Sequence, residues 1–179
     1  MIYVFLANGF EETEALTTVD ILRRAELDVA TVGIGGKEVT SSHAITVVAD
    51  IEDKDVTTYN MNGIVLPGGM PGTLNLEKSK TVKESVSFCN ENNLPIGAIC
   101  AAPSILGHMG LLKGRNATCF PGFENELTEA NVVKDFVVKD GNIITGKGAG
   151  STIVFALKLV ETLVSEELAN KIRTSLQCP

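Results

Sequence analysis

The chain has 179 residues, of which 44% are hydrophobic and 21% charged, and this balance is typical of a globular protein and excludes a disordered or fibrous chain. Fifteen basic and 22 acidic residues give a net charge of −7, which argues against nucleic acid as a partner, because binding to phosphates needs a clustered basic surface. No apolar run approaches the roughly 18 residues of a membrane span. The apolar start, Ile2 to Ala7, is too short for a signal peptide and has no basic leader. We therefore expect a cytoplasmic protein with no membrane partner.

The predicted elements alternate between short apolar runs and longer helical patterns, which is typical of βαβ units around a parallel sheet. The expected strands are Ile2–Leu6, Val29–Ile34, a half-exposed Ile45–Val48, Ile64–Leu66, Pro95–Ile99, and a hairpin formed by Phe136–Val138 and Ile143–Thr145. The expected helices are Glu14–Arg24, Lys80–Asn92, one that begins near Pro103, Ser151–Val164 and Glu166–Leu176. No repeat or linker interrupts them. The prediction is one α/β domain over residues 1–179 with a mostly parallel central sheet plus a β-hairpin.

The four cysteines are Cys89, Cys100, Cys119 and Cys178, and their spacing contains no CxxC pair. A zinc site and a thioredoxin motif are therefore poorly supported. In a reducing compartment these residues are thiols, so the useful question is whether one of them is activated.

Cys100 has the most informative surroundings. The run from Gly97 to Pro103 places it at the carboxyl end of a strand, between small residues and just before a helix, as in a nucleophile elbow. A helix N-terminus would lower the pKa of its thiol, and ligands of open α/β folds bind at this edge of the sheet. The alternative is a buried cysteine that acts as a small hydrophobic residue.

Gly68 and Gly69 open a glycine-rich loop, Gly68 to Gly72, directly after a buried strand. Glycines allow backbone N–H groups to approach a small site closely, as in an oxyanion hole. The alternative is a loop that simply needs positive φ. The two interpretations are about equally supported once a cysteine elbow lies on a neighbouring strand.

Two further segments and the histidines are ambiguous. Glu11, Glu12 and Glu14 lie in the first turn of a helix, where they complement the dipole, although one of them could point toward Cys100. The Gly146–Thr152 segment is not a Walker loop. It could form an anion-binding helix start beside the site, but a plain strand-to-helix turn explains it better. His108 lies two helical turns beyond Cys100, about 12 Å away, which is too far for a general base. His43 sits in an expected hairpin.

Four blocks in this order resemble the ThiJ/PfpI superfamily, and within it the Parkinson disease protein 7 clade. They are Asn8 to Ala15, Val65 to Gly72, Ala98 to Pro103 and Gly148 to Ser151. Each block is weakly specific, but the combination is highly specific and spans nearly the whole chain. The resemblance implies a flavodoxin-like three-layer sandwich, a homodimer, and chemistry that uses neither cofactor nor metal.

The resemblance also implies roles for individual residues. It assigns the nucleophile to Cys100 and, to Glu14, the protonated carboxyl that hydrogen-bonds the sulfur. A carboxylic acid that burial keeps neutral beside a thiolate can donate such a bond. Gly69 and Ala101 match positions whose amides form the family's oxyanion pocket. Gly68 supports the turn, and Lys147 matches a basic position lining the pocket.

One position departs from the pattern. Many members carry a His before the Pro of the segment that here ends in Phe120 and Pro121. A mechanism that needs imidazole is therefore not expected, and the predicted turnover is weak. Cys119, one residue earlier, is a candidate second thiol near Cys100.

Three hypotheses for function follow from the resemblance. The leading one is cofactor-independent conversion of methylglyoxal or glyoxal to a hydroxy acid, or repair of early glycation adducts on proteins, with Cys100 adding to the aldehyde. The second is a redox-sensing or chaperone protein in oxidative stress, whose Cys100 is oxidised rather than catalytic. A peptidase or amidotransferase relative ranks last, because no His stands beside the cysteine.

Overall fold

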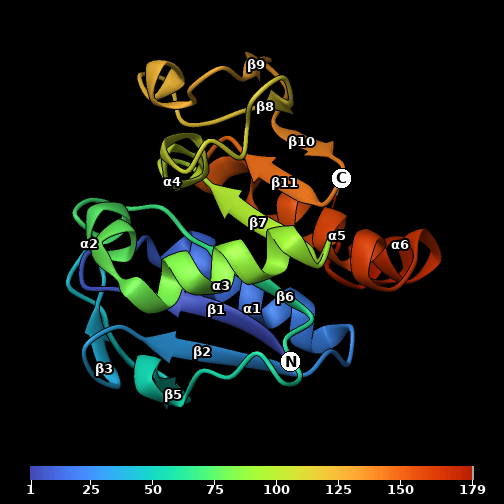
Figure 1. Cartoon of the computed structure of the whole chain (residues 1–179). Coiled ribbons are helices and arrows are strands. Elements are labelled where there is room, and N and C mark those ends of the chain that lie inside the picture. The colour runs from blue at the N-terminus through green and yellow to red at the C-terminus, as the bar shows by residue number, and fades with distance from the viewer. Residues whose placement is uncertain (179) are drawn as a thin grey trace.

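The computed structural model describes residues 1–178, so Pro179, the last residue of the expected domain, lies outside the described residues. Its central sheet has seven strands in the order β10-β11-β7-β6-β1-β2-β5. These are β10 (Val137–Asp140), β11 (Ile143–Gly146), β7 (Ile96–Ile99), β6 (Gly63–Leu66), β1 (Ile2–Leu6), β2 (Val29–Gly33) and β5 (Ile51–Glu52). All neighbours pair in parallel except β10 and β11, which form the expected antiparallel hairpin. The predicted mostly parallel α/β class is confirmed (Figure 1).

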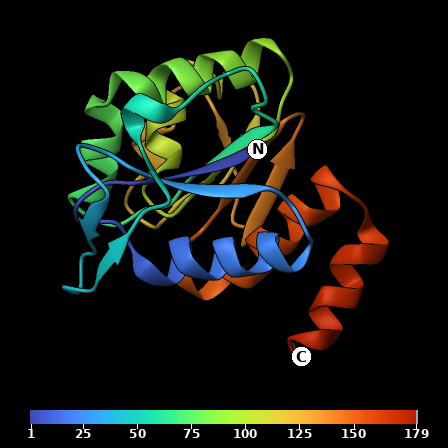
Figure 2. The same cartoon turned by 90° about the horizontal axis from the view of Figure 1, so that it is seen from below.

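Helices cover both faces of this sheet, as the view from below shows (Figure 2). One face carries α1 (Glu12–Arg24) and α5 (Thr152–Leu163), which pack against each other, with α6 (Glu166–Ser175) packed on α5. The other face carries α2 (Gly72–Lys78), α3 (Lys80–Glu91) and α4 (Pro103–His108). The three-layer sandwich expected from the resemblance is therefore confirmed.

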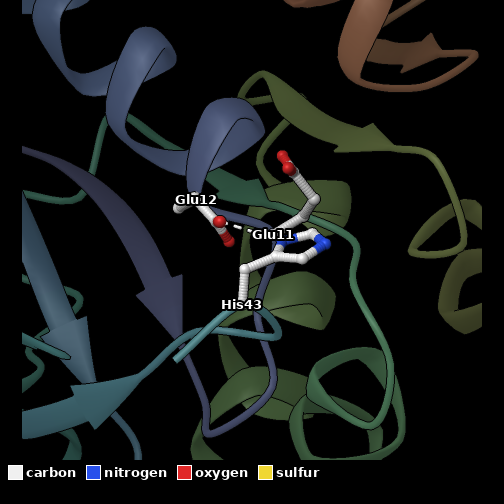
Figure 3. Close-up of side chains that lie close together, drawn as sticks. All are labelled: Glu11, Glu12 and His43. Atoms are coloured by element: carbon white, nitrogen blue, oxygen red, sulfur yellow. Dashed lines mark ion pairs between the residues drawn. The ribbon is translucent and has the colours of Figure 1, made fainter. Parts of the chain in front are cut away.

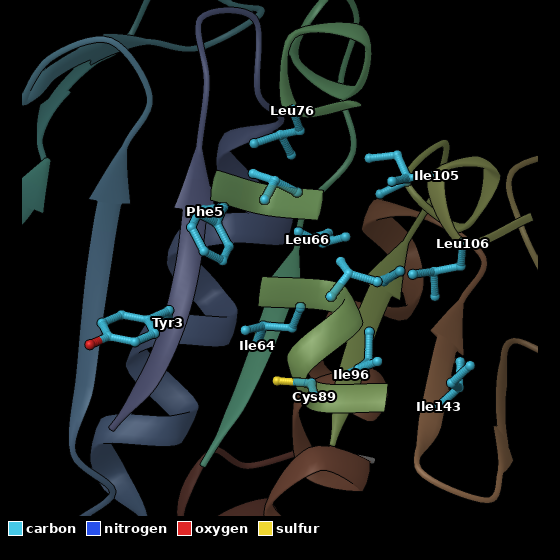
Figure 4. Close-up of a cluster of buried hydrophobic side chains, with 14 of the residues drawn as sticks. Tyr3, Phe5, Ile64, Leu66, Leu76, Cys89, Ile96, Ile105, Leu106 and Ile143 are labelled. Atoms are coloured by element: carbon cyan, nitrogen blue, oxygen red, sulfur yellow. The ribbon is translucent and has the colours of Figure 1, made fainter. Parts of the chain in front are cut away.

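The buried strands explain why their sequences are apolar throughout. β1, β6 and β7 are buried at every residue, because helices cover both of their faces. Their side chains divide between two core clusters, one on each side of the sheet. Figure 4 shows the cluster under α3, with Phe5, Leu66 and Cys89 directed into it.

The structure adds elements that the sequence pattern does not predict. These are the helix α2, the edge strand β5, and the 3₁₀ turns η1 (Asp53–Asp55), η2 (Glu124–Glu126) and η3 (Ala149–Ser151). The half-exposed segment near residue 46 pairs outside the main sheet, as β4 (Thr46–Val48) against β3 (Glu38–Thr40). A second small pair joins β8 (Asn116–Ala117) to β9 (Asn131–Val132). Apart from β4, which the sequence predicts, these elements are short, so each carries too little hydrophobic periodicity to be recognised.

The register of the parallel strands determines what gathers at one edge of the sheet. Leu66 lies opposite Ala98 on β7, and Gly146 lies opposite Ile99. The segments that follow β1, β6, β7 and β11 therefore leave the sheet at the same edge, where open α/β folds bind ligands. Across residues 1–178, no helix combines the length and apolar character needed to cross a bilayer.

Candidate active site

Cys100 stands at a sharp bend directly after β7. Its φ is +65°, in the left-handed region that residues other than glycine seldom adopt. The bend is held from both sides: the Cys100 N–H donates to the Gly146 carbonyl at 2.9 Å, and the Phe120 N–H donates to the Cys100 carbonyl at 2.8 Å. The thiol therefore projects from a backbone position that two neighbouring segments fix.

The residues around this bend are small because there is no space for side chains. A Cβ added at Gly68 would lie 2.6 Å from Cys100 Cβ and 2.8 Å from Glu14 Oε2. Ala101 and Ala102 are buried as well. Glu14 and Cys100 thus converge on the same glycine from different sides, although 86 residues separate them in the sequence.

The Glu14 side chain is the buried carboxyl of the site. It lies on the first turn of α1 and only 1% of it is exposed. Its Oε2 accepts a hydrogen bond from the Gly68 N–H at 2.8 Å, and its Oε1 is buried without a hydrogen bond that meets standard geometry. Burial raises the pKa of Glu14 to about 7, although bonds from the Gly68 amide and the Cys100 thiol act in the opposite direction. Near neutral pH the group therefore exists partly as the acid.

The Cys100 thiol does not have the lowered pKa that the sequence predicts. Burial, the negative charge of Glu14 and a hydrogen bond to that carboxyl together raise its pKa to about 12, although the amides of Ala101 and Gly69 act to lower it. The prediction was wrong because burial disfavours the thiolate and the nearest charge is negative. When Glu14 carries the proton, its charge no longer opposes the thiolate, so the two groups titrate as a pair.

The glycine-rich loop is packed tightly on the start of α1. Gly69 has a φ of +92°, and a Cβ there would lie 2.4 Å from the Glu11 amide nitrogen. The Gly68 carbonyl accepts from the Glu11 N–H at 3.0 Å, and the Gly69 carbonyl accepts from the Thr73 N–H at 2.9 Å. This packing places the Gly69 amide where it favours the Cys100 thiolate.

The other two acidic residues have structural partners. Glu11 caps α1, because its Oε2 accepts from the Glu14 N–H at 2.6 Å. Glu12 pairs with Nδ1 of His43 at 2.8 Å, on the turn between β3 and β4 (Figure 3). Single ligand atoms from Glu11, Glu12 and His43 lie within 4.8 Å of one another, a spacing that a cation could use. Glu11 therefore has a structural role as the cap of α1, and Glu12 has one in holding the β3–β4 hairpin through His43.

Phe120 and Lys147 line a shallow cavity of about 290 Å³ that also includes Phe136 and the segment from Gly148 to Ser151. The Lys147 Nζ lies 5.5 Å from the centre of the Phe136 ring. Phe120 is 47% exposed, so it forms an open wall rather than filling a closed niche. Both residues are connected to Cys100 through the backbone. Lys147 follows Gly146, whose carbonyl accepts from the Cys100 N–H, and the Phe120 N–H donates to the Cys100 carbonyl.

Cys119 is buried and packs in the core cluster under α3, whereas Cys100 packs against the cluster on the side of α1 and α5. Burial, with the charge of Glu124, raises the pKa of Cys119 to about 11, and the charge of Lys147 opposes this. Lys147 therefore acts on Cys119, and it is not among the groups that shift the pKa of Cys100. Sequence reasoning missed Gly146, whose carbonyl fixes the Cys100 bend, since no local pattern marks a backbone acceptor.

Comparisons with known proteins find relatives that match almost the whole chain. The DJ-1/PfpI family profile matches residues 1–162. The chain is 36% identical to the Parkinson disease protein 7 homolog of Danio rerio over 97% of its own length and 94% of that protein. It is 34% identical to the glutathione-independent glyoxalase DJR-1.2 of Caenorhabditis elegans, over 90% of this chain and 87% of that one.

Coverage differs for the plant relatives. Protein DJ-1 homolog B of Arabidopsis thaliana is 37% identical over 93% of this chain, yet the chain spans only 38% of that protein's length. Among solved structures, a DJ-1 superfamily protein from Salmonella typhimurium superposes with a TM-score of 0.94 at 36% identity, covering 99% of this chain and 98% of that one. The fold, the cysteine bend and these matches together mean that the chain belongs to the DJ-1/PfpI family.

Proposed function

We propose that this protein converts small reactive aldehydes, such as methylglyoxal and glyoxal, to hydroxy acids without a cofactor, or repairs the early adducts that they form on proteins. The observation that carries the proposal is the convergence of the Cys100 bend and the buried Glu14 carboxyl on Gly68. A relative 34% identical to this chain bears the name glutathione-independent glyoxalase, which supports the same chemistry.

In the first step Cys100 acts as the nucleophile. Its sulfur attacks the aldehyde carbon while the thiol proton moves to Glu14, and Glu14 then passes this proton to the alkoxide oxygen, which gives a neutral hemithioacetal and a free carboxylate. Because ionised Glu14 opposes the thiolate, transfer of the proton to Glu14 removes the charge that raises the thiol's pKa. The amides of Gly69 and Ala101, which favour the Cys100 thiolate, are the donors that we assign to the developing oxyanion.

In the second step the Glu14 carboxylate takes the proton from the aldehyde carbon and returns it to the adjacent carbon, while the hydroxyl proton moves to the ketone oxygen, which converts the hemithioacetal of methylglyoxal to a thioester. A carboxyl with a pKa of about 7 can both accept and donate a proton near neutral pH. Water then hydrolyses the thioester, so that methylglyoxal and one water give lactate and the free thiol. We expect slow turnover, because Phe120 supplies no imidazole for this hydrolysis.

The test compares wild type with Cys100→Ser in a methylglyoxal assay that measures lactate by a stereospecific readout. We expect lactate from wild type and at least a hundredfold less from Cys100→Ser. Loss of methylglyoxal alone is an unsuitable readout, since thiols trap the aldehyde reversibly. Equal lactate formation by both proteins would contradict the proposal.

A redox-sensing role is the second candidate, and the partial exposure of Cys100 favours it. An accessible sulfur beside a hydrogen-bonding acid is suited to selective sulfinate formation. This role becomes the better account if wild type forms no lactate while low peroxide oxidises Cys100 before the other cysteines, as read by peptide mass spectrometry.

We further infer a homodimer in the cytoplasm. The four cysteines, Cys89, Cys100, Cys119 and Cys178, are all free, which suits a reducing compartment. Sedimentation velocity tests the assembly: a species of twice the 19.0 kDa chain mass is expected, and a monomer at all accessible concentrations would contradict it.

A further inference from the structure

His108 ends α4 and lies between two carboxylates from other parts of the chain. Its Nδ1 is 2.6 Å from Glu77 Oε1 on α2, and its Nε2 is 2.8 Å from Glu126 Oε2 on η2. A neutral imidazole has one N–H and can donate to only one acceptor, whereas imidazolium has two. The two contacts therefore require the protonated ring, which donates to both carboxylates and so bridges α2 to η2.

The three segments that meet at His108 also meet at Cys100. The first is the stretch from Cys100 through α4, which ends at His108 itself. The second runs from Gly68 and Gly69 into α2: the Gly69 carbonyl accepts from the Thr73 N–H at 2.9 Å, and the helix continues to Glu77. The glycine-rich loop and Glu77 therefore lie at opposite ends of one rigid segment, which consists of the loop and α2.

The third segment is a relay of backbone hydrogen bonds. The Phe120 N–H donates to the Cys100 carbonyl at 2.8 Å, the Phe123 N–H donates to the Phe120 carbonyl at 3.1 Å, and the Glu126 N–H donates to the Phe123 carbonyl at 3.0 Å. This segment also packs closely on α4, since a Cβ at Gly107 would lie 2.2 Å from the Glu126 carbonyl oxygen. Movement of η2 away from α4 would therefore disturb the residue that holds the Cys100 carbonyl.

We propose that protonated His108 is a positioning residue, which fastens the Gly68–Gly69 loop and the Phe120 turn to the helix that follows Cys100. His108 touches no reacting atom and acts through the segments that form the pocket. The inference rests on the proposed function for its catalytic consequence, but the bridge itself is independent of any substrate.

The charges around the ring give the pH dependence its sign. The charged groups that face His108 are Glu77 from α2 and Glu126 from η2, and α4 contributes no other titratable side chain. Hydrogen bonds to Glu77 and then to Glu126 raise the pKa of His108 above its usual 6.5. The bridge is therefore fully formed well below the ordinary pKa of 6.5 and is lost as the pH rises through the raised pKa.

The test uses His108→Gln, Glu77→Gln and Glu126→Gln, with His43→Gln as the matched control, because these are the two histidines of the chain. NMR of the imidazole carbons first measures the pKa of each ring. We expect His108 to titrate above 6.5 in wild type and to fall toward 6.5 in both glutamate variants. A His108 that titrates at 6.5 in wild type would overturn the bridge.

The second readout is the rate of Cys100 alkylation by iodoacetamide, expressed as the ratio of wild type to variant at each pH. This ratio largely cancels the ionisation of Cys100 itself. We expect His108→Gln to differ from wild type several-fold at a pH below the His108 pKa measured by NMR, with the ratio approaching one well above that pKa, and His43→Gln to stay near one throughout. A ratio that does not change with pH would overturn the positioning role.

The methylglyoxal kcat/KM ratio of wild type to His108→Gln should follow the same pH course. If wild type forms no lactate at any pH, the proposed function fails, and the alkylation ratio alone decides on His108. If lactate forms but the kcat/KM ratio is independent of pH, the proposed function stands and the positioning inference fails.

Discussion

Cys100 and Glu14 form a pair in which ionised Glu14 makes ionisation of the thiol less favourable, whereas the hydrogen bond from the thiol favours the Glu14 carboxylate. Burial alone raises both pKa values, and the charge of Glu14 adds to the rise at Cys100. A buried pair of this kind holds one negative charge more easily than two. The chemistry proposed for the site needs such a pair, because the proton leaves the thiol and stays close by for the next step.

The first prediction concerns which acidic residue carries the proton. Glu14→Gln keeps the acceptor for the Gly68 N–H but cannot exchange a proton, so the methylglyoxal kcat should fall by on the order of a hundredfold or more. Glu11→Gln and Glu12→Gln are the controls and should change kcat by less than about threefold, since both residues face structural partners. Equal losses in the three variants would show that the acidic turn acts through the helix dipole alone.

The second prediction follows from the raised pKa of Glu14. Between pH 4.5 and about 7 the folded protein holds a proton that the unfolded chain has lost. The stability contributed by this proton is complete below pH 4.5 and disappears as the pH rises through 7. The shift is worth about 3 kcal/mol at roughly 1.4 kcal/mol for each pKa unit.

Urea denaturation of wild type and Glu14→Gln at pH 5 and pH 8 measures this contribution. Wild type should lose more unfolding free energy than Glu14→Gln across that interval, because glutamine does not titrate. Parallel losses in the two proteins would mean that Glu14 has an ordinary pKa in the folded state.

The third prediction concerns the position where many relatives carry a histidine. Phe120→His places an imidazole on the segment that binds the Cys100 carbonyl. Since Phe120 is half-exposed, the polar ring costs little stability there. Methylglyoxal kcat should rise several-fold if hydrolysis of the thioester limits turnover. A folded variant with no gain, together with rapid peroxide oxidation of Cys100 in wild type, would favour the redox role.

At the scale of elements, the glycine-rich loop has to lie against the Cys100 bend without side chains between them. The fourth prediction concerns Gly68→Ala, which would place a methyl group 2.6 Å from Cys100 Cβ. We expect this variant to lose about 1–3 kcal/mol of unfolding free energy and to lose turnover. Gly150→Ala is the control, because no atom lies within 4 Å of its added Cβ. Both are read by thermal denaturation and lactate formation. A stable, active Gly68→Ala would show that the loop packs differently.

Much of the fold could be predicted because continuous apolar runs mark buried parallel strands. β1, β6 and β7 and the helices α3 and α5 fall within a residue or two of their predicted bounds. α2 could not be predicted, since Gly72 to Lys78 is a short stretch that includes weak helix formers. It forms because the loop before it is anchored to the start of α1, which is a tertiary effect.

The bend at Cys100 could also be predicted, because it follows from strand order and small neighbours. The electrostatics of the thiol could not. Glu14 reaches Gly68 across 54 residues of sequence, and the resulting burial and charge reverse the shift that a helix N-terminus would produce. Local sequence shows which groups are present but not which of them face each other.

At the scale of the whole molecule, the candidate site is assembled from segments that follow four different strands. The start of α1, the Gly68 loop, the Cys100 bend and the turn before α5 meet only because β1, β6, β7 and β11 run in parallel and end at one edge. Helices on both faces of the sheet hold this edge in place. The sheet is therefore the scaffold, and the site exists only once the strands have paired.

The central claim is that Cys100 forms a covalent bond to the aldehyde on the way to the hydroxy acid. A single-turnover reaction of the protein with methylglyoxal, quenched at intervals and analysed by peptide mass spectrometry, tests it directly. We predict an adduct with the mass of one methylglyoxal on the peptide that contains Cys100, which forms before lactate and decays at the rate at which lactate forms. Lactate formation without any adduct on that peptide, or an adduct that persists while lactate accumulates, would contradict the account.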